Sequence, residues 1–577
     1  MKITGAQVVI ECLVEQGVDT IFGYPGGNIL NIYDALYKNS SRINHILTAH
    51  EQAAAHAADG YARSTGKVGV CMATSGPGAT NLVTGIATAY MDSSPIVAIT
   101  CNVANNLLGK DTFQEIDITG VTIPITKHNF LVRDVNELAN TIREAFEIAR
   151  SGRPGPVLVD ILKDVTAAEV EFEPLHKQSD KTKFILKNHE NFKRVIDISV
   201  PSDEEIKHAV DMINSSERPV IYAGGGIKIS GAEKELLEFA EKGSIPVCES
   251  LMARDCFPSE HPLCTWMVGM HGTKASNMAI TESDLVIALG ARFSDRVIGD
   301  PSKFAQKAKV LHIDIDPAEI NKNIATDNSI VGDIKSILKR LIPSVRKDKR
   351  TSWNQCVAEW KKEVPSTYNV VKENSINPKF LCETIHKIAG DSTFITTEVG
   401  QHQMWTAQFY PFSKPRTFVT SGGLGTMGFG TGAAMGIQIA NPNSRVIHIA
   451  GDGSFRMNCN ELATIQHYNI PVVIVIVNNG ALGNVRMWQR LFYGKRFSQT
   501  TLDFGPDWIK LADAYGISAW KAQNAKEFEK VFKEAFDSKK PALIDARVDI
   551  DEMVLPMVPG GKPVYAQIME LSEEIMN

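Results

Sequence analysis

The sequence predicts an α/β fold built from three doubly wound parallel-sheet domains. Short apolar runs that end in glycine or an acidic residue alternate with helical segments, as in strand, helix, parallel-strand units. This alternation occurs in three blocks separated by two polar, charged stretches. A chain of 577 residues also exceeds what one hydrophobic core normally supports, so several domains are expected.

The first block covers residues 1–170, and its strand and helix candidates alternate as in a doubly wound sheet. A polar, lysine-rich stretch at 171–200 follows it, and we expect a linker there. The expected strands are 20–23, 68–73, 96–100 and 157–161, and the helices begin near Thr4, Glu51, Gly78 and Val135.

The second block covers residues 201–343, and the third covers 376–577. Residues 344–375 between them are charged and weakly periodic, so a second linker is expected. The sequence has no short-period repeat. The strand candidates of the second block again end in glycine or acid, and they lie within 218–226, 284–290 and 310–314.

The composition is that of a large globular enzyme with no nucleic-acid or membrane partner. Hydrophobic residues make up 44% and charged residues 22%, and the net charge of -6 leaves no basic footprint for nucleic acid. The nine cysteines form no Cys-x-x-Cys pair, which favours reduced thiols over disulfides or structural zinc. The longest apolar run, 470–477, is far shorter than the roughly 20 residues of a membrane helix. The helical pattern at 4–16 leaves no room for a signal peptide, so we expect a cytoplasmic protein.

Gly451-Asp452-Gly453 and the later pair Asn478-Asn479 have the layout of a metal-diphosphate clamp. If the strands before them are parallel neighbours, Asp452 and Asn479 emerge at adjacent strand ends, where open α/β sheets bind ligands. A carboxylate, an amide oxygen, a backbone carbonyl and a diphosphate suit Mg²⁺. Each of the two motifs alone is more often an ordinary turn. Their spacing across one strand, helix, strand unit favours the clamp. The expected strands are 446–450 and 471–477, with a helix over 457–468.

Glu51 opens an alanine-rich helical segment in the first block. Small residues permit close packing, so its carboxylate is expected to be desolvated, which suits a group that shuttles protons at neutral pH. The alternative is that Glu51 only complements the helix dipole in a first turn. The nearby turn over 74–81 follows a strand and starts a helix. Its polar residues either surround a ligand or only serve the conformation of a tight turn.

Five motifs in this order resemble the thiamine-diphosphate-dependent decarboxylase and carboligase superfamily and, within it, the acetolactate (acetohydroxyacid) synthase family. They are the Glu51 segment, the 74–81 turn, Phe113-Gln114-Glu115, the glycine-rich run 421–428 and the clamp. The similarity extends from about Ile3 to the 554–559 segment. It implies a pyrimidine-binding domain at 1–170, a central FAD-associated domain at 201–343, and a diphosphate-binding domain with a C-terminal arm at 376–577.

The resemblance also implies how thiamine diphosphate and Mg²⁺ are held. Glu51 matches the cofactor-activating glutamate, which hydrogen-bonds the aminopyrimidine ring, and Gly27 matches a backbone group beside that ring. Phe113 and Gln114 match residues that line the reaction centre, and Lys163 matches a lysine near the channel. The Mg²⁺ ligands are matched by Asp452, Asn479 and the carbonyl of Ala481. The residues matching the rest of the cofactor site are Val399, Gly400, Gln401, His402, Gly425, Met427, Gly451, Gly453 and Ser454.

The middle block resembles the FAD-bearing segments of the biosynthetic acetolactate synthases, in which the flavin is structural. Arg296 is implied to neutralise the carboxylate of a second 2-ketoacid, because a guanidinium fork fits a carboxylate. Met270 is also implied to contact the substrate. Trp488 matches a tryptophan associated with preference for 2-ketobutyrate. Taken alone, such an arginine is more often a surface ion-pair partner and the tryptophan a core residue. The residues implied to contact FAD are Arg153, Gly224, Gly225, Met270, His271, Arg292, Asp314 and Asp333.

Five positions depart from the family pattern, and they leave acceptor preference, inhibitor response and cofactor affinity open. They are Asn28 in place of Ala, Asn31 in place of Pro, Leu162 in place of Pro, Asn484 in place of Met and Met487 in place of Gln.

The implied reaction is decarboxylation of pyruvate on thiamine diphosphate and carboligation to a second 2-ketoacid. The products are 2-acetolactate or 2-aceto-2-hydroxybutyrate, in branched-chain amino acid biosynthesis. The family joins the glutamate and the clamp across subunits, so a homodimer or tetramer is implied, with a small regulatory subunit as a further partner. Three alternatives stay open: another enzyme of the superfamily, a flavin-free catabolic acetolactate synthase, or a non-catalytic homologue that retains the fold.

Overall fold

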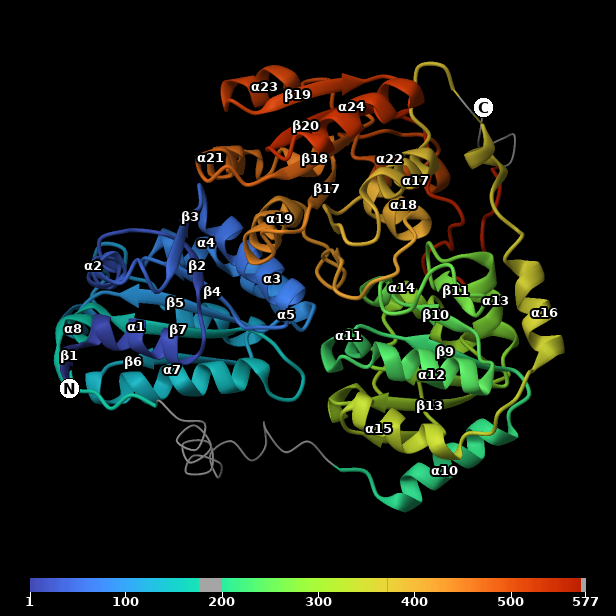
Figure 1. The fold of residues 1–577 in the computed structure, drawn as a ribbon, viewed down its shortest axis with the longest axis horizontal. Coiled ribbons are helices and arrows are strands. Elements are labelled where there is room, and N and C mark those ends of the chain that lie inside the picture. Colours follow the sequence, from blue (N-terminus) through green and yellow to red (C-terminus); the bar gives the residue numbers. More distant parts are fainter. Residues whose placement is uncertain (176–199, 371, 572–577) are drawn as a thin grey trace.

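The computed structural model describes residues 1–175, 200–370 and 372–571, which form three α/β domains (Figure 1). Each domain contains a six-stranded sheet whose neighbouring strands are parallel. The predicted fold class is therefore confirmed. In Figure 1 the N-terminal domain is blue to teal, the middle domain is green to yellow, and the C-terminal domain is yellow to red. Most of the linker expected at 171–200 lies outside the described residues.

The N-terminal sheet has the strand order β3-β2-β4-β5-β7-β6. Strands β4, β5 and β7 are fully buried, as expected for parallel strands covered on both faces. Helices α1 (Gly5–Glu15) and α7 (Val135–Arg150) cover one face, and α3 (Glu51–Thr65) and α5 (Val83–Met91) cover the other. The strands are β2 (Thr20–Tyr24), β3 (Asn44–Leu47), β4 (Gly69–Ala73), β5 (Ile96–Asn102), β6 (His128–Val132) and β7 (Val157–Leu162).

The middle sheet has the order β11-β10-β9-β12-β13-β14. Its helices are α10 (Asp203–Ser215), α12 (Glu233–Gly243) and α15 (Ile334–Leu341) on one face, and α13 (Lys274–Glu282) and α16 (Thr351–Trp360) on the other. Helix α16 lies within the stretch 344–375, and its Trp353 and Val357 enter the core of the middle domain. The strands are β9 (Pro219–Ala223), β10 (Val247–Glu249), β11 (Cys264–Met267), β12 (Leu285–Leu289), β13 (Lys309–Asp314) and β14 (Asn328–Val331).

The C-terminal sheet has the order β16-β15-β17-β18-β20-β19. Helices α17 (Pro378–Ala389), α18 (Gln401–Phe409) and α24 (Ala525–Asp537) cover one face, and α19 (Phe429–Ala440), α21 (Leu462–His467) and α23 (Trp508–Ala514) cover the other. The strands are β15 (Phe394–Thr397), β16 (Phe418–Val419), β17 (Val446–Gly451), β18 (Val472–Asn478), β19 (Ser518–Ala522) and β20 (Ala542–Arg547).

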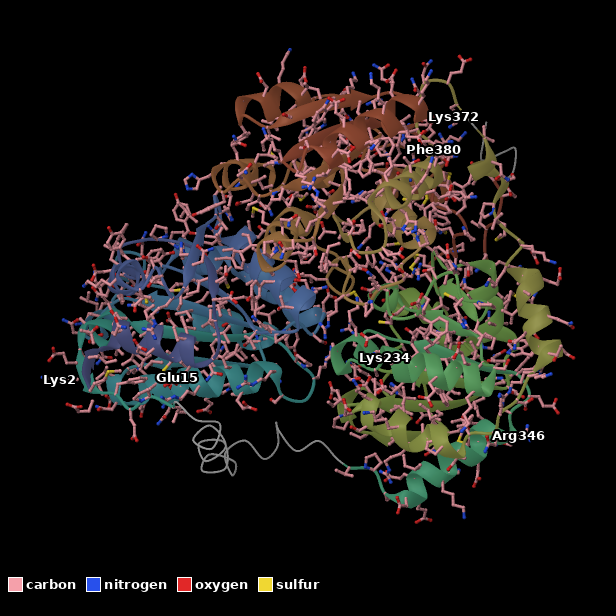
Figure 2. All side chains as sticks on the ribbon, viewed as in Figure 1. Lys2, Glu15, Lys234, Arg346, Lys372 and Phe380 are labelled. Atoms are coloured by element: carbon pink, nitrogen blue, oxygen red, sulfur yellow. The ribbon has the colours of Figure 1, made fainter. Side chains whose placement is uncertain are left out.

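Helices α3 and α19 join the N-terminal and C-terminal domains and lie side by side between them (Figure 1). Their backbones approach closely because small residues face one another. A Cβ on Gly436 would lie 1.9 Å from the carbonyl oxygen of Ala57, and one on Gly60 would lie 2.3 Å from that of Ala433. The alanine-rich composition of α3 therefore serves this close packing between domains. Charged side chains such as those of Lys2, Arg346 and Lys372 lie at the surface (Figure 2).

The crossover between β17 and β18 differs in part from the sequence prediction. Both strands are present and parallel, as predicted. The helix expected over 457–468 is α-helical only from Leu462 to His467, after a single 3-10 turn at Cys459–Glu461. Asn458 is not helical, with φ of -133°, and its side chain donates to the carbonyl of Gly428. An unexpected short helix, α20 (Asp452–Phe455), begins directly after β17.

Candidate active site

Asp452 and Asn479 follow the ends of two adjacent parallel strands, as the clamp requires. Strands β17 and β18 pair with Gly451 opposite Val477, so the two side chains emerge at one edge of the sheet. The Asn479 amide donates to Gln401 Oε1 at 3.0 Å and accepts the N–H of Ala481 at 3.1 Å. Its orientation is thus fixed from both sides.

Both clamp residues are buried but line a cavity of about 390 Å³. Burial raises the pKa of Asp452 to about 6, while hydrogen bonds from the backbone and the charges of Arg547 and Arg456 oppose that shift. Both arginines line the same cavity. The cavity therefore combines a desolvated carboxylate with two cations, an arrangement that suits a metal ion and an anionic ligand.

The segment that begins α18 lies against the clamp. A Cβ on Gly451 would lie 2.8 Å from Nδ1 of His402, and one on Gly483 would lie 1.9 Å from Oε1 of Gln401. The ring Nε2 of His402 is buried and has no partner among the described residues, and burial lowers the pKa of this histidine to about 3. A neutral imidazole with an open nitrogen thus lies next to the clamp.

The remaining residues predicted for the cofactor site lie on the loops around the same sheet edge. Val399 and Gly400 follow β15, and Gly400 has φ of 156°. Gly425 is in the left-handed region, with φ of 73°, and Met427 is half-buried just before α19. Within α20, Gly453 packs against Leu482 and Ser454 donates to the carbonyl of Gly451 at 3.2 Å.

Glu51 begins α3 and lies in the N-terminal domain with the turn at 74–81. Its carboxylate is buried and accepts a hydrogen bond from Asn81 Nδ2 at 2.9 Å. A Cβ on Gly78 would lie 3.2 Å from Glu51 Oε1, so this glycine leaves room for the carboxylate. The turn thus contacts the Glu51 carboxylate through Asn81 and Gly78, and its role as the rim of a ligand site stays a prediction.

The other catalytic residues predicted in the N-terminal domain lie in loops or at the start of a helix. Gln114 has φ of 62° and its backbone lies against Gly76, while the neighbouring Phe113 side chain is 86% exposed. Gly27 has open space where a side chain would be. Lys163 is exposed at the start of α8 (Lys163–Ala167), after β7.

In the middle domain, the predicted glycines lie at adjacent strand ends. A Cβ on Gly224 would lie 1.9 Å from the carbonyl of Gly290, so the turns after β9 and β12 pack directly together. Gly225 lies next to the side chain of Met252. Arg292 is half-buried after β12.

Two predicted acids of the middle domain have local structural partners. Asp314 is buried at the end of β13 and accepts the N–H of Asp316 at 2.9 Å. Asp333 caps helix α15 by accepting the N–H of Ser336 at 2.9 Å. Helix capping alone accounts for an aspartate at position 333.

Arg153 connects the N-terminal domain with the middle domain. Its guanidinium forms ion pairs with Asp316 at 3.2 Å and Glu319 at 2.7 Å and donates to Ser93 Oγ at 2.8 Å. The structure thus brings this predicted FAD contact from the first block to the middle domain.

Met270, His271, Arg296 and Trp488 gather where the middle domain meets the C-terminal domain. The N–H of Met270 donates to the carbonyl of Arg296 at 2.7 Å, and its own carbonyl accepts the N–H of Val558 in the C-terminal arm at 2.7 Å. The Arg296 guanidinium lies over the ring of Trp488, 5.8 Å from its centroid. The Trp488 indole nitrogen and the His271 Nδ1 are buried without partners among the described residues, and burial lowers the pKa of His271 to about 4.

The structure therefore forms separate groups of predicted residues within one chain. Around Asp452 it gathers the clamp and the α18 segment, and around Glu51 it gathers the N-terminal turns. No hydrogen bond or ion pair among the described residues joins the Glu51 carboxylate to the clamp.

Two buried acids that sequence reasoning missed also lie close by. Glu398 accepts N–H groups of Gly428 at 2.5 Å and Gly430 at 3.0 Å, and Glu461 accepts that of Ala49.

The departures from the family pattern occupy defined places. The side chain of Asn28 donates to Ser75 Oγ at 2.6 Å, and that of Asn31 donates to Thr166 Oγ1 at 2.9 Å. Leu162 and Met487 are buried in the cores of their domains, whereas Asn484 has a buried Oδ1 without a partner in the described part of the chain.

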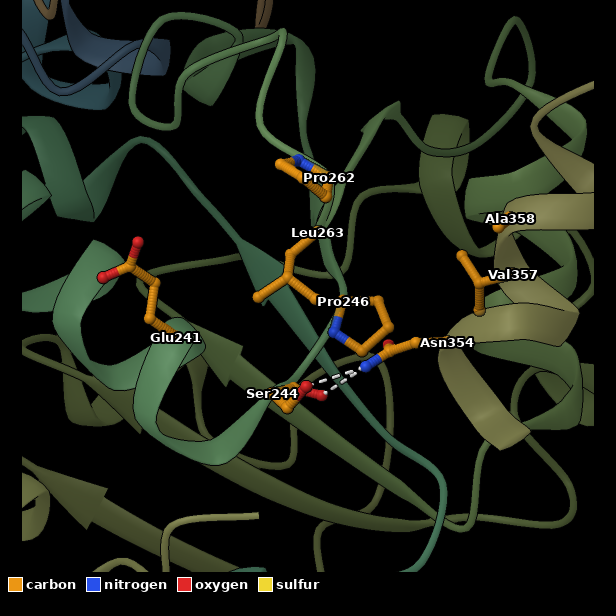
Figure 3. A pocket seen from close by; sticks show the side chains of 8 residues that line it. All are labelled: Glu241, Ser244, Pro246, Pro262, Leu263, Asn354, Val357 and Ala358. Atoms are coloured by element: carbon orange, nitrogen blue, oxygen red, sulfur yellow. Dashed lines mark hydrogen bonds between the residues drawn. The ribbon is translucent and has the colours of Figure 1, made fainter. Parts of the chain in front are cut away.

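A second cavity, of about 440 Å³, lies in the middle domain (Figure 3). It is lined by Ser244 and Leu263 on one side and by Asn354 and Val357 of α16 on the other, and Asn354 donates to Ser244 Oγ at 2.8 Å. None of the residues predicted to be functional lines this cavity.

Over the described residues, no helix combines the length and apolar character needed to cross a bilayer. The same residues contain no group of three or more His, Cys, Asp or Glu side chains positioned to hold a metal ion. The clamp is of another kind, because it offers one carboxylate, one amide oxygen and one backbone carbonyl.

Three family models match successive parts of the chain. Residues 3–121 match the N-terminal TPP binding domain of thiamine pyrophosphate enzymes, residues 206–341 the central domain, and residues 398–546 the C-terminal TPP binding domain.

Curated relatives are similar over nearly the whole chain. A probable acetolactate synthase large subunit of Methanocaldococcus jannaschii is 51% identical, covering 96% of this chain and 94% of its own length. An acetolactate synthase of Arthrospira platensis is 45% identical, covering 97% and 96%. An acetolactate synthase large subunit of Buchnera aphidicola is 43% identical, covering 97% of each chain. The chain therefore belongs to the thiamine pyrophosphate enzymes and, among them, to the acetolactate synthase large subunits.

Proposed function

We propose that the protein decarboxylates pyruvate and joins the remaining two-carbon unit to a second 2-ketoacid, either pyruvate or 2-ketobutyrate. The products are 2-acetolactate and 2-aceto-2-hydroxybutyrate, for branched-chain amino acid biosynthesis. The contact between Arg296 and Trp488 carries this proposal. Trp488 lies on the helix that follows the clamp and offers a large apolar surface. Arg296 reaches it from the middle domain and offers a cation that fits a carboxylate.

The residues of the clamp fit Mg²⁺ and the diphosphate of thiamine diphosphate. Asp452, Asn479 and the carbonyl of Ala481 would supply the oxygen ligands that Mg²⁺ prefers. His402 Nε2 is a buried ring nitrogen without a partner among the described residues, and it suits a hydrogen bond to a phosphate oxygen. When bound, thiamine diphosphate supplies the electron sink that decarboxylation of a 2-ketoacid requires.

The side chains of the protein would bind, orient and move protons. Glu51 would exchange a proton with the aminopyrimidine ring of the cofactor, and the hydrogen bond from Asn81 fixes one of its carboxylate oxygens. Arg296 would bind the carboxylate of the second 2-ketoacid, while Trp488 packs against the alkyl group of that acid. Gln114 and Phe113 would line the same space once a partner protomer covers them.

The middle domain fits FAD in a structural role. The buried Nδ1 of His271 has no partner in the described part of the chain, so it would pair with a polar group of the flavin. Gly224 and Gly225 leave the backbone accessible at the strand end, Arg292 provides a cation, and Arg153 reaches this domain from the first. No net electron transfer is needed in the proposed reaction.

A homodimer is part of the proposal. The Glu51 carboxylate has no bond to the clamp of its own chain within the described residues, and large apolar side chains on the N-terminal domain are exposed, with Phe113 at 86% and Ile123 at 67%. Exposed apolar groups of this kind are typical of interaction surfaces. Glu51 of one protomer would then face the clamp of its partner, and a tetramer would pair such dimers. The relatives named large subunits suggest a small regulatory subunit as a further partner.

The colour and size of the purified protein test the cofactor and dimer assignments. The flavin should remain bound, with its absorbance band, and sedimentation should give a dimer or larger species with Mg²⁺ and thiamine diphosphate present. Arg292→Ala should lower flavin occupancy. A colourless protein that makes acetolactate would assign the chain to the flavin-free synthases, and an active monomer would contradict the shared site.

A further inference from the structure

The segment that leads into Glu51 is held by side chains of the C-terminal domain. Strand β3 ends at Leu47 and helix α3 begins at Glu51, so three residues connect them. The N–H of Leu47 donates to the hydroxyl of Tyr468 at 2.9 Å, and the N–H of Ala49 donates to Oε2 of Glu461 at 3.1 Å. Both acceptors lie more than 400 positions further along the sequence.

Glu461 is fully buried at this contact. Besides Ala49, the N–H of His50 hydrogen-bonds its carboxylate, and Thr464 Oγ1 donates to it at 2.7 Å. Burial raises the pKa of Glu461 to about 7, and these hydrogen bonds oppose that shift. The buried carboxylate is compensated by the two backbone N–H groups that it accepts, those of Ala49 and His50 at the domain boundary.

Helix α3 offers no hydrogen-bond acceptor to the N–H groups of Ala49 and His50, because both residues precede it. The first N–H groups of a helix lack intrahelical partners, and His50 uses its ring Nδ1 to accept the N–H of Gln52 at 3.1 Å. The N–H groups of Ala49 and His50 precede the helix and are therefore satisfied from outside, by Glu461. Because Glu51 follows directly, a shift of this backbone would move its carboxylate relative to Asn81.

Glu461 is not the only contact that joins the two domains. Helices α3 and α19 already pack through small residues, such as Gly436 against Ala57. Glu461 lies on the crossover between Asp452 and Asn479. The same unit that carries the clamp thus also holds the backbone that presents Glu51.

We propose that Glu461 is a positioning residue for Glu51: its carboxylate fixes the backbone at Ala49 and His50 so that the Glu51 carboxylate is held for proton transfer at the cofactor. The inference rests on the proposed function, because it takes Glu51 as the group that activates the cofactor. Glu461 is not among the residues that line the cavity at the clamp.

The variant Glu461→Gln tests the proposal because the amide has the same shape but offers one acceptor oxygen in place of two. We expect kcat to fall about ten- to hundredfold, as for a misplaced catalytic group, while KM for pyruvate and the dissociation constant of thiamine diphosphate change less than about threefold. Thr464→Val is the matched control: it removes another hydrogen bond to the same carboxylate but leaves the backbone contacts, so kcat should stay within about twofold of the wild type.

Two further readouts separate positioning from general stability. In the cofactor-free protein, hydrogen exchange of the amides of Ala49 and His50 should accelerate in Glu461→Gln, while the interior of α3 stays protected. In a double-mutant cycle, Glu461→Gln should cost little further turnover once Glu51 is already Gln, because both changes remove one function. If Glu461→Gln does not fold, Glu461→Asp, which withdraws the carboxylate by one methylene, carries the same expectations.

A comparison of Glu51→Gln with Glu461→Gln separates failure of the positioning role from failure of the proposed function. If Glu51→Gln itself leaves turnover unchanged, the role of Glu51 is wrong, and the inference about Glu461 fails with it. If Glu51→Gln is inactive but Glu461→Gln keeps wild-type kcat, or the two effects multiply in the double variant, only the positioning role is overturned. Loss of cofactor affinity in place of kcat would also overturn it.

Discussion

The guanidinium of Arg296 lies over the indole ring of Trp488, 5.8 Å from the ring centroid, although the two residues belong to different domains. Arg296 follows β12 in the middle domain, and Trp488 lies in α22 (Gly483–Phe492) of the C-terminal domain. A cation–π contact of this kind attracts the guanidinium to the face of the ring. Together they place a cation beside an apolar surface.

We predict that Trp488→Leu shifts the product ratio toward 2-acetolactate when pyruvate and 2-ketobutyrate compete as acceptors. A smaller side chain makes less contact with the additional methylene of 2-ketobutyrate, and such a group is worth about 1–3 kcal/mol of discrimination. Trp520→Leu, a partly buried tryptophan of the same domain, is the control and should leave the ratio unchanged. An unaltered ratio in Trp488→Leu would show that selectivity lies elsewhere, for example near Asn484.

Glu51→Gln should lower turnover by about a hundredfold or more and leave the fold intact, in line with loss of a general acid-base group. Glu137→Gln is a matched control, because Glu137 is likewise an acid in the first turn of a helix but is exposed at the start of α7. Steady-state kinetics and circular dichroism check both variants. Wild-type turnover in Glu51→Gln would remove Glu51 from the mechanism.

Cofactor binding should weaken as the pH falls below about 6. Burial raises the pKa of Asp452 to about 6 in the metal-free protein, and a protonated carboxyl group cannot bind Mg²⁺. The dissociation constant measured with Mg²⁺ and thiamine diphosphate should therefore be nearly constant above that pH and rise by up to about tenfold per unit below it. Asp452→Asn should bind Mg²⁺ and thiamine diphosphate more weakly at every pH. It should also lack the weakening below about pH 6 that protonation of Asp452 causes in the wild type. Identical profiles would contradict the assignment.

Gly436→Ala should destabilise the contact between the N-terminal and C-terminal domains. The added Cβ would lie 1.9 Å from the carbonyl oxygen of Ala57, so α19 must move away from α3. Overpacking of this kind costs about 1–3 kcal/mol, which corresponds to a fall of several degrees in melting temperature. Gly560→Ala is the control, because no atom lies within 4 Å of the added Cβ. Equal melting temperatures for both variants would show that the helices are not rigidly packed.

The fold and the clamp could be predicted from the sequence because both depend on local patterns. Buried parallel strands appear as continuous apolar runs, and the strand pair β17 and β18 brings Asp452 beside Asn479 by connectivity alone. The helix within that unit was harder to place, because Asn458 bonds a distant carbonyl and interrupts it.

Glu461 could not be recognised as a partner of the Glu51 segment, because 412 positions separate it from Ala49. The same limit applies to Glu398, which follows β15 and accepts the backbone N–H groups of Gly428 and Gly430. In both cases the tertiary contact supplies the partner, and no periodicity or spacing reports it.

Conversion of pyruvate by the purified protein tests the central claim most directly. With thiamine diphosphate, Mg²⁺ and FAD present, we predict that 2-acetolactate accumulates as carbon dioxide is released, and that both stop when Mg²⁺ is chelated. The protein would be a different enzyme, or a non-catalytic relative, if thiamine diphosphate binds and pyruvate yields no 2-acetolactate.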